Sequence, residues 1–285
     1  MGAGIDGRRR GRRRRVAGET AAHARTRRAG GRGDRGRSGR VAGAGFGPGT
    51  GCYSGLVTAA ALPAGERKAR AVEAMFDRIA PRYELVNRVM TFGLDGGWRR
   101  RTVRELALPR GALVLDLGCG TADLCRILEH DGYHAIGVDM AAEMLAHAHT
   151  DATLLRGDMS RLPFGDGTAD GVVSGFALRN VVDIDVSLRE AARVLRPGGR
   201  AAFLEVSEPA APVLRAVHRV YFRHVVPLIG SALSDGDAYR YLPASTSYLP
   251  SAATLVAQLR NAGFSRVRRV VLGGGAAQIL MGTRR

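Results

Sequence analysis

Two closely spaced glycines, Gly118 and Gly120, follow an apolar run without a linker, in the segment ALVLDLGCG at residues 112–120. The four apolar residues that open this segment predict a strand covered on both faces, as in parallel sheets. Glycine lets the backbone turn tightly and approach a ligand closely, because it has no Cβ. We expect a helix over residues 122–130 next, with Thr121 as its cap and its N-terminal NH groups facing the turn. The segment therefore predicts a ligand-binding turn between a buried strand and a helix.

An acid, Asp139, ends a second apolar run nineteen positions after Gly120. An acid at the tip of the second strand of such a unit is where the two hydroxyls of a ribose find a hydrogen-bond acceptor. Asp116, near the end of the first strand, stands beside the same turn. The spacing predicts a nucleoside ligand, and an ordinary strand-to-helix turn is the structural alternative.

Two nucleoside ligands fit this spacing. In the dinucleotide version a third glycine follows the second by three positions, and here that position is Asp123. A carboxylate beside the loop would repel a pyrophosphate, but it would suit a ligand that carries an ammonium and a sulfonium. We therefore expect S-adenosylmethionine as the cofactor, with an NAD-dependent dehydrogenase as the alternative.

Further candidate residues follow the third and fourth predicted strands, at residues 153–156 and 170–176. Asp158 comes directly after the third strand, within reach of an adenine amino group. Arg179 and Asn180 follow the fourth strand and are expected at the opening of the crevice. The residues that these positions predict around the cofactor are Asp116, Gly118, Gly120, Asp139 and Asp158.

The charge of this 285-residue chain is unevenly distributed. Its net charge is +17, and residues 1–45 hold fourteen arginines against three acids, a net of +11. This segment has too few apolar residues to offset the entropy lost on ordering. We therefore expect residues 1–62 to be a disordered Arg/Gly-rich extension and residues 63–285 to be the folded domain. A nucleic-acid-binding tail, a general arginine bias and a misassigned start remain open for the extension.

The cysteine count and the hydropathy favour a cytoplasmic protein. The three cysteines form no CxxC pair, and no apolar run approaches the length of a membrane span. An insertion at residues 208–250 contains an amphipathic helical pattern over residues 213–233. This pattern predicts a lid over an apolar substrate or a contact with a membrane surface, with a core helix as the alternative. His218 and His224 lack partner ligands, so we assign them to the polar face and expect no metal.

The last two predicted strands, at residues 265–272 and 276–282, are separated only by a short glycine turn, so they must pair antiparallel. A doubly wound sheet that ends in an antiparallel hairpin is typical of class I methyltransferases. At this point the chain resembles the ubiquinone/menaquinone biosynthesis C-methyltransferases of the UbiE and MenG type, over residues 72–282. The segments that carry the resemblance are MFDRIAPRYELVNRVMTFGLDGGWRR, LDLGCGTADL, GDMSRLPF, FALRNVVD, EAARVLRPGGRAAFLEVSEP and DAYRYLPAS.

The resemblance implies an α/β, Rossmann-like class I fold with a seven-stranded, mostly parallel sheet, an antiparallel last strand and a helical lid insertion. It implies methyl transfer from S-adenosylmethionine to a ring carbon of a prenylated demethylquinol, most simply demethylmenaquinol. Carried over by position, it also adds further residues to those expected to hold the cofactor, namely Thr121, Met140, Gly157, Met159 and Gly175. A ubiquinone precursor or another lipophilic phenol is the enzyme alternative, and a nucleic-acid-binding protein using the arginine-rich arm is the alternative from another class.

We expect the ring oxygen of the acceptor to be polarised by residues that follow the fourth strand. The catalytic candidates are Arg179, Asn180 and Tyr83, and the substrate-binding candidates are Asn87, Trp98, Tyr239 and Tyr241. The expected partners are the quinol and, at the periphery, the inner face of the plasma membrane; a homodimer stays open and nucleic acid is disfavoured.

Overall fold

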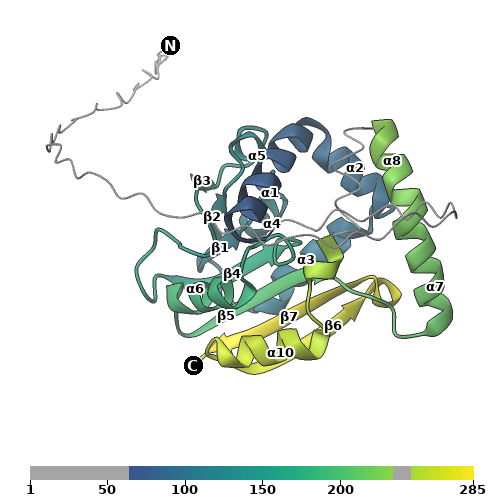
Figure 1. Cartoon of the computed structure of the whole chain (residues 1–285). Helices are drawn as coiled ribbons and strands as arrows, with labels where there is room; N and C mark the ends of the chain where they lie inside the picture. The colour runs from purple at the N-terminus through teal and green to yellow at the C-terminus, as the bar shows by residue number, and fades with distance from the viewer. Residues whose placement is uncertain (1–63, 234–244) are drawn as a thin grey trace, which may run out of the picture. The chain divides into compact units, whose positions relative to one another are not determined.

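The structure is a computed structural model that describes residues 64–233 and 245–285. Its centre is a seven-stranded sheet with the order β3-β2-β1-β4-β5-β7-β6 (Figure 1). The strands are β1 (Leu113–Leu117), β2 (His134–Asp139), β3 (Thr153–Arg156), β4 (Ala169–Gly175), β5 (Leu195–Val206), β6 (Phe264–Leu272) and β7 (Ala277–Arg284).

The first five strands are parallel, and β7 runs antiparallel to both of its neighbours, β5 and β6. The predicted class I fold with a final hairpin is thus confirmed. Because β1 lies between β2 and β4, the strand order reverses there, and the carboxyl ends of these three strands meet at one edge. Such a switch point is where open α/β sheets bind their ligands.

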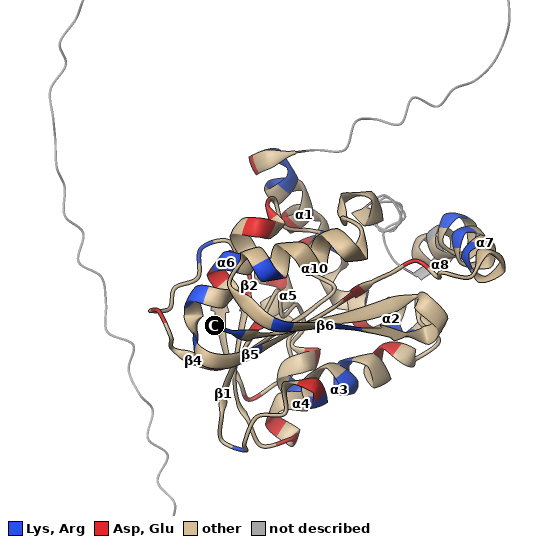
Figure 2. Cartoon of the chain, turned by 90° about the horizontal axis from the view of Figure 1, so that it is seen from below, with Lys and Arg blue, Asp and Glu red and all other residues tan. Residues whose placement is uncertain are grey.

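Helices cover both faces of the sheet (Figure 2). On one face α6 (Ile184–Val194) and α10 (Ala252–Asn261) pack through buried leucines and alanines onto β5 and β7. On the other face lie α3 (Leu94–Leu106) and α4 (Asp123–His130). Both faces of β1 are therefore buried, which explains why its sequence is a continuous apolar run rather than an alternating one.

Besides the cores on the two faces of the sheet, a separate cluster of buried residues joins the N-terminal helices to the insertion after β5. The N-terminal helices are α1 (Gly65–Ile79), η1 (Ala80–Arg82) and α2 (Tyr83–Met90). Helix α1 contacts the short helix α5 (Ala142–Ala146). The insertion supplies α7 (Pro212–Val220), η2 (Tyr221–Val225) and α8 (Val226–Leu233), one helical run as its pattern predicts. The Tyr221 hydroxyl donates to the carbonyl of Met90 at 2.8 Å, which ties this run to α2. No helix in the described part of the chain is long and apolar enough to cross a membrane.

Two predicted boundaries differ from the structure. Residues 197–199, a proline followed by two glycines, predict a firm break before the fifth strand, but they lie inside β5, which begins at Leu195. The pairing between β4 and β5 shifts register there, so the proline and glycines form an irregularity rather than an end. The pattern of residues 141–149 predicts a helix over the whole segment, but only the five residues of α5 are helical. The η3 turn (Thr246–Tyr248) and the η4 turn (Gly273–Gly275) complete the structure.

Candidate functional site

The loop between β1 and α4 is built around two glycines with left-handed backbones, Gly118 (φ 70°) and Gly120 (φ 55°). A Cβ on Gly118 would lie 2.6 Å from the Cβ of Ala177, so a larger residue would push the loop away from the segment after β4. The NH groups of Gly118 and Cys119 donate to the carbonyl of Val138, at 2.8 and 3.1 Å. These bonds fasten the loop to β2 and hold the backbone close to the sheet edge.

Thr121 does not cap the following helix, contrary to the expectation from sequence. The helix begins one residue later than predicted, and its N-cap is Ala122, in a left-handed conformation with no side-chain cap. The loop needs this extra residue to complete its turn, so the threonine is carried inward and is 3% exposed. Its Oγ1 has no hydrogen-bond partner among the described residues. A buried hydroxyl in this state is costly unless a ligand or water satisfies it.

Asp139 ends β2 and helps to fix the loop. One carboxylate oxygen accepts from the NH of Gly120 at 2.8 Å and the other from the NH of Ala141 at 2.9 Å. Burial raises the pKa of Asp139, while these backbone bonds oppose that shift. The two oxygens of a carboxylate together offer about four acceptor sites, so capacity remains for a ribose hydroxyl.

A pocket opens at this edge of the sheet, and we call it the first pocket; it encloses about 720 Å³ up to its open mouth. Its walls include most of the residues predicted to hold the cofactor, and its roof comes from α1. The predicted residues that line it are Gly118, Gly120, Asp139, Met140, Gly157, Asp158, Met159 and Gly175, together with the catalytic candidates Tyr83 and Asn180. The loop has two glycines without a Cβ, and the pocket has acids and apolar walls. These features suit a nucleoside with a sulfonium-bearing tail, so these residues fit S-adenosylmethionine.

Asp116 and Thr121 are not among the residues that line the first pocket. Asp116 is fully buried, and burial raises its pKa to about 7. The thiol of Cys125 donates to one of its oxygens at 3.5 Å, and the other oxygen has no partner within the described residues. Asp116 therefore lies behind the loop as a carboxyl group that protonates near neutrality.

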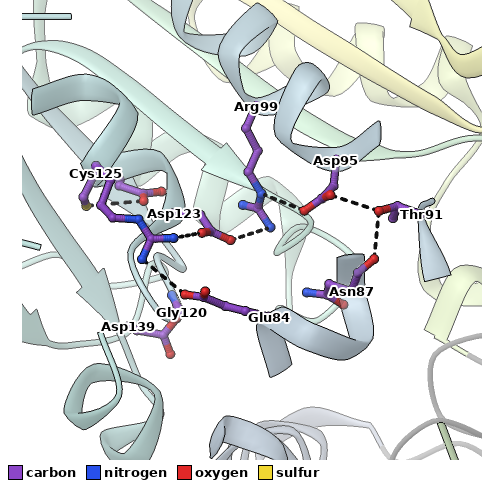
Figure 3. A network of polar contacts seen from close by, with 11 residues as sticks. Glu84, Asn87, Thr91, Asp95, Arg99, Gly120, Asp123, Cys125 and Asp139 are labelled. Carbon is purple, nitrogen blue, oxygen red and sulfur yellow. Dashed lines mark hydrogen bonds and ion pairs between the residues drawn. The ribbon is translucent and has the colours of Figure 1, made fainter. Parts of the chain in front are cut away.

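Asp123 belongs to a chain of polar contacts that links α2, α3 and α4 (Figure 3). Arg126 forms an ion pair with it, and Arg99, 6% exposed, lies 3.5 Å from its other oxygen. Each guanidinium is shared with a second acid, Arg126 with Glu84 and Arg99 with Asp95, and Asp123 does not line the first pocket. The role we inferred from its charge, repelling a pyrophosphate, stays a prediction. The same chain continues through Asp95 and Thr91 to the carbonyl of Asn87.

A second pocket of about 900 Å³ lies next to the first, and its walls are mainly apolar. Tyr83 and Phe176 line both pockets. The predicted substrate residues Asn87 and Trp98 line the second pocket, and so does Arg179. The other two, Tyr239 and Tyr241, lie outside the described residues.

Arg179 is held in the second pocket by Glu205, which is completely buried. Its guanidinium donates to one oxygen of Glu205 at 2.5 Å, and its backbone NH donates to the other at 3.2 Å. Its Nε has no partner within the described residues. Asn180 lies on the side of the first pocket instead, where its amide donates to the carbonyl of Phe176 at 3.3 Å. The adjacent candidates Arg179 and Asn180 thus face different pockets.

Two residues of the second pocket were missed or misassigned from sequence. His218, assigned to the polar face of its helix, lines the pocket and stacks on Phe222, with ring centroids 4.4 Å apart. Burial lowers its pKa, so it is neutral at neutral pH. Phe176 has a left-handed backbone (φ 61°), a conformation that costs energy and often marks a functional site. No group of three or more His, Cys, Asp or Glu side chains within residues 64–233 and 245–285 could hold a metal.

Curated relatives match most of the chain. A protein of Syntrophotalea carbinolica named "Ubiquinone/menaquinone biosynthesis C-methyltransferase UbiE" is 40% identical over 74% of this chain and 92% of its own. A protein of Roseiflexus castenholzii named "Demethylmenaquinone methyltransferase" is 43% identical over 79% of this chain and 98% of its own.

Solved structures show the same fold at low identity. A SAM-dependent methyltransferase from Thermotoga maritima is 21% identical, with a TM-score of 0.55 over 75% of this chain and 100% of its own.

A model of the ubiE/COQ5 methyltransferase family matches residues 64–284, which include both pockets and every described element. The chain therefore belongs to the ubiE/COQ5 methyltransferase family and is an S-adenosylmethionine-dependent methyltransferase.

Proposed function

We propose that this enzyme methylates a ring carbon of a prenylated demethylquinol, with demethylmenaquinol as its substrate in menaquinone biosynthesis. The observation that carries the proposal is the pair of adjoining pockets with Tyr83 and Phe176 in both walls. One pocket has the acids and bare backbone that a nucleoside needs, and the other has the apolar walls that a prenylated ring needs. The names of the relatives from Syntrophotalea carbinolica and Roseiflexus castenholzii support the same acceptor class.

In the first pocket, Asp139 would accept the ribose hydroxyls and Asp158 the adenine amino group. Gly118 and Gly120 leave room for the ligand to lie against the backbone. The bound S-adenosylmethionine supplies an electrophilic methyl group on its sulfonium. The protein has to present that methyl group to the neighbouring pocket with water excluded, because positioning alone lowers the barrier by several kcal/mol.

In the second pocket, the acceptor ring must become electron-rich. Loss of the quinol hydroxyl proton would make the adjacent ring carbon nucleophilic, so that it could accept the methyl group that S-adenosylmethionine supplies; loss of the proton on that carbon would then restore aromaticity. Arg179, paired with Glu205 and open at Nε, would stabilise the phenolate oxygen. Tyr83, at the junction of the two pockets, would hold the ring in line.

The direct test incubates the purified protein with methyl-labelled S-adenosylmethionine and short-chain demethylmenaquinol, beside the corresponding demethylated benzoquinol. We expect label in the naphthoquinol ring, with a lower kcat/KM for the benzoquinol. The Arg179→Ala variant should lose turnover while it still binds S-adenosylhomocysteine. A protein that binds S-adenosylhomocysteine but labels neither quinol would contradict the proposed acceptor.

We also propose that α7 contacts the anionic inner face of the membrane from the cytoplasm. Its exposed apolar side chains include Val213 (76% exposed), Val217 (63%) and Val220 (60%), and exposed Arg219 and Arg223 flank them. An apolar stripe bordered by arginines matches an anionic lipid surface, which also holds the prenylated substrate. The basic residues of α7 are seen in Figure 2.

Sedimentation with vesicles tests this surface. We expect binding to vesicles rich in anionic lipid, weaker binding to neutral vesicles, and loss of both in Val217→Asp. Binding that is unaffected by Val217→Asp would contradict the proposal, as would a stable dimer that this substitution dissociates.

We further propose residues 1–62 as a dispensable extension, so that a protein of residues 63–285 should keep full activity.

A further inference from the structure

The chain contains 43 lysines and arginines, and Lys68 is its single lysine. It lies in the first turn of α1 and is 5% exposed, whereas the neighbouring Arg70 pairs with Glu66 at the surface. Lysine is seldom buried unless its ammonium is satisfied. The contacts of Lys68 therefore indicate why an otherwise arginine-based sequence has a lysine here.

The ammonium of Lys68 has three partners among residues 64–233 and 245–285. It donates to the carbonyl of Val181 at 2.6 Å and to the carbonyl of Arg179 at 3.1 Å. It also lies 3.8 Å from the centroid of the Tyr248 ring, within the range of a cation–π contact. A compact ammonium can aim its three protons in these directions, but a planar guanidinium is larger and presents its donors as a fork.

These contacts join the walls of the two pockets. Ala69, which follows Lys68, and Val72, one turn further along α1, line the first pocket. Arg179, whose carbonyl Lys68 holds, lines the second pocket. Glu205 holds the same arginine by its backbone NH and its guanidinium. The backbone of Arg179 is thus fixed at its NH from β5 and at its carbonyl from α1.

We propose that Lys68 is a positioning residue that couples the seating of α1 over the methyl donor to the placement of Arg179 in the acceptor pocket. The coupling rests on the proposed function of Arg179. When α1 is seated, the ammonium draws the 179–181 backbone into place; without it, the carbonyls of Arg179 and Val181 lose this donor and both pocket walls loosen. Lys68 therefore acts on donor affinity and on turnover together, although it lines neither pocket.

The first test compares Lys68→Met and Lys68→Arg with the matched control Arg70→Met, two residues along the same helix. We expect Lys68→Met to weaken S-adenosylhomocysteine binding by calorimetry about tenfold and to lower kcat about tenfold, the range for removing a hydrogen-bonded charged group. Lys68→Arg should rescue neither, and Arg70→Met should change neither. A Lys68→Met variant that only melts at a lower temperature, with wild-type affinity and kcat when folded, would overturn the proposal.

The second test uses the single lysine as a probe in the otherwise unaltered protein. Selective ¹³Cε-lysine labelling should give one side-chain NMR signal, from Lys68. Burial lowers the pKa of Lys68, so the signal should titrate below the ordinary lysine value of 10.5. It should shift on adding S-adenosylhomocysteine; a signal that does not respond would overturn the coupling. Because neither this signal nor the calorimetry uses an acceptor, both outcomes are independent of whether the acceptor is a demethylquinol.

Discussion

The two pockets are neighbours, yet they are built by different means. Backbone groups shape the loop side of the first pocket: the NH groups of Gly118 and Gly120 are fixed to β2 and its terminal Asp139. The second pocket is lined by side chains from α2, α3, α7, η2 and the strand ends. A donor shared by many methyltransferases can be held by one local motif, whereas an individual acceptor requires a surface assembled from distant segments.

The largest expected effect is in the first pocket, with Gly118→Ala. The added Cβ would meet Ala177 at 2.6 Å on a backbone with φ 70°, so we expect S-adenosylhomocysteine affinity to fall about 100-fold, near 3 kcal/mol. Gly111→Ala is the matched control, because Gly111 has φ 82° but no atom within 4 Å of its built Cβ. Calorimetry should show normal affinity for the control. Equal losses in the two variants would show that backbone strain alone, and not the close approach, matters.

Glu205→Gln should instead affect the second pocket. Removing one charge of a buried pair leaves the Arg179 guanidinium uncompensated, so we expect kcat to fall about 30-fold, corresponding to roughly 2 kcal/mol. Donor affinity should not change, because the glutamine oxygen can still accept from the backbone NH of Arg179 and the backbone that Lys68 holds stays in place. The exposed pair of Glu66 with Arg70 supplies the control, Glu66→Gln, which should be neutral. Steady-state kinetics with calorimetry separates the two pockets. A loss of donor affinity in Glu205→Gln would contradict this separation.

Asp116 allows a test by pH. Its pKa in the folded protein is about 7 against 3.8 for the unperturbed group, so the folded state binds a proton that the unfolded state has released. The stability from this group is complete below about pH 4 and is lost as the pH rises to 7. Urea unfolding should show that the stability of the wild-type protein falls by roughly 2 kcal/mol between pH 5.5 and pH 8, and that Asp116→Asn abolishes this fall. Identical pH dependence in both proteins would exclude this role for Asp116.

The smallest effect is expected from Trp98→Phe, at the outer wall of the second pocket. Trp98 packs on the turn after β6, where a Cβ on Gly273 would come 2.7 Å from its ring. The smaller ring leaves a gap, so we expect the KM for the quinol to rise about fivefold, near 1 kcal/mol, and kcat to stay unchanged. Kinetics with the quinol varied at saturating donor measures it. An increase in the KM for the donor would place Trp98 in the function of the first pocket.

Much of the first pocket could be predicted from sequence. Glycine spacing, strand ends and following acids are local features, and the carboxyl ends of adjacent parallel strands must meet. The errors concern single side chains. The capping role of Thr121 depended on the dihedral angles of Ala122. Asp123 lies outside the first pocket and pairs with Arg99, 24 positions earlier on another helix.

The second pocket could be predicted only in part. Arg179 was predicted at the opening of the crevice from its position after the fourth strand, and Trp98 was named as a substrate residue through a family motif. His218 was assigned to a polar face because the helical pattern alone does not show what lies opposite. From the sequence, Lys68 can be noticed only as the single lysine of the chain, because its carbonyl partners lie 111 and 113 positions away.

The sequence by itself determined the parallel sheet, its final hairpin, the glycine loop and the acid that faces it, because apolar periodicity and backbone freedom act over a few neighbouring residues. Only the tertiary structure decided which side of the switch point Arg179 and Asn180 face, which acids are neutralised and what the lone lysine holds. Those outcomes depend on contacts between segments far apart in the chain, where burial removes water and makes each unpaired charge or carbonyl costly.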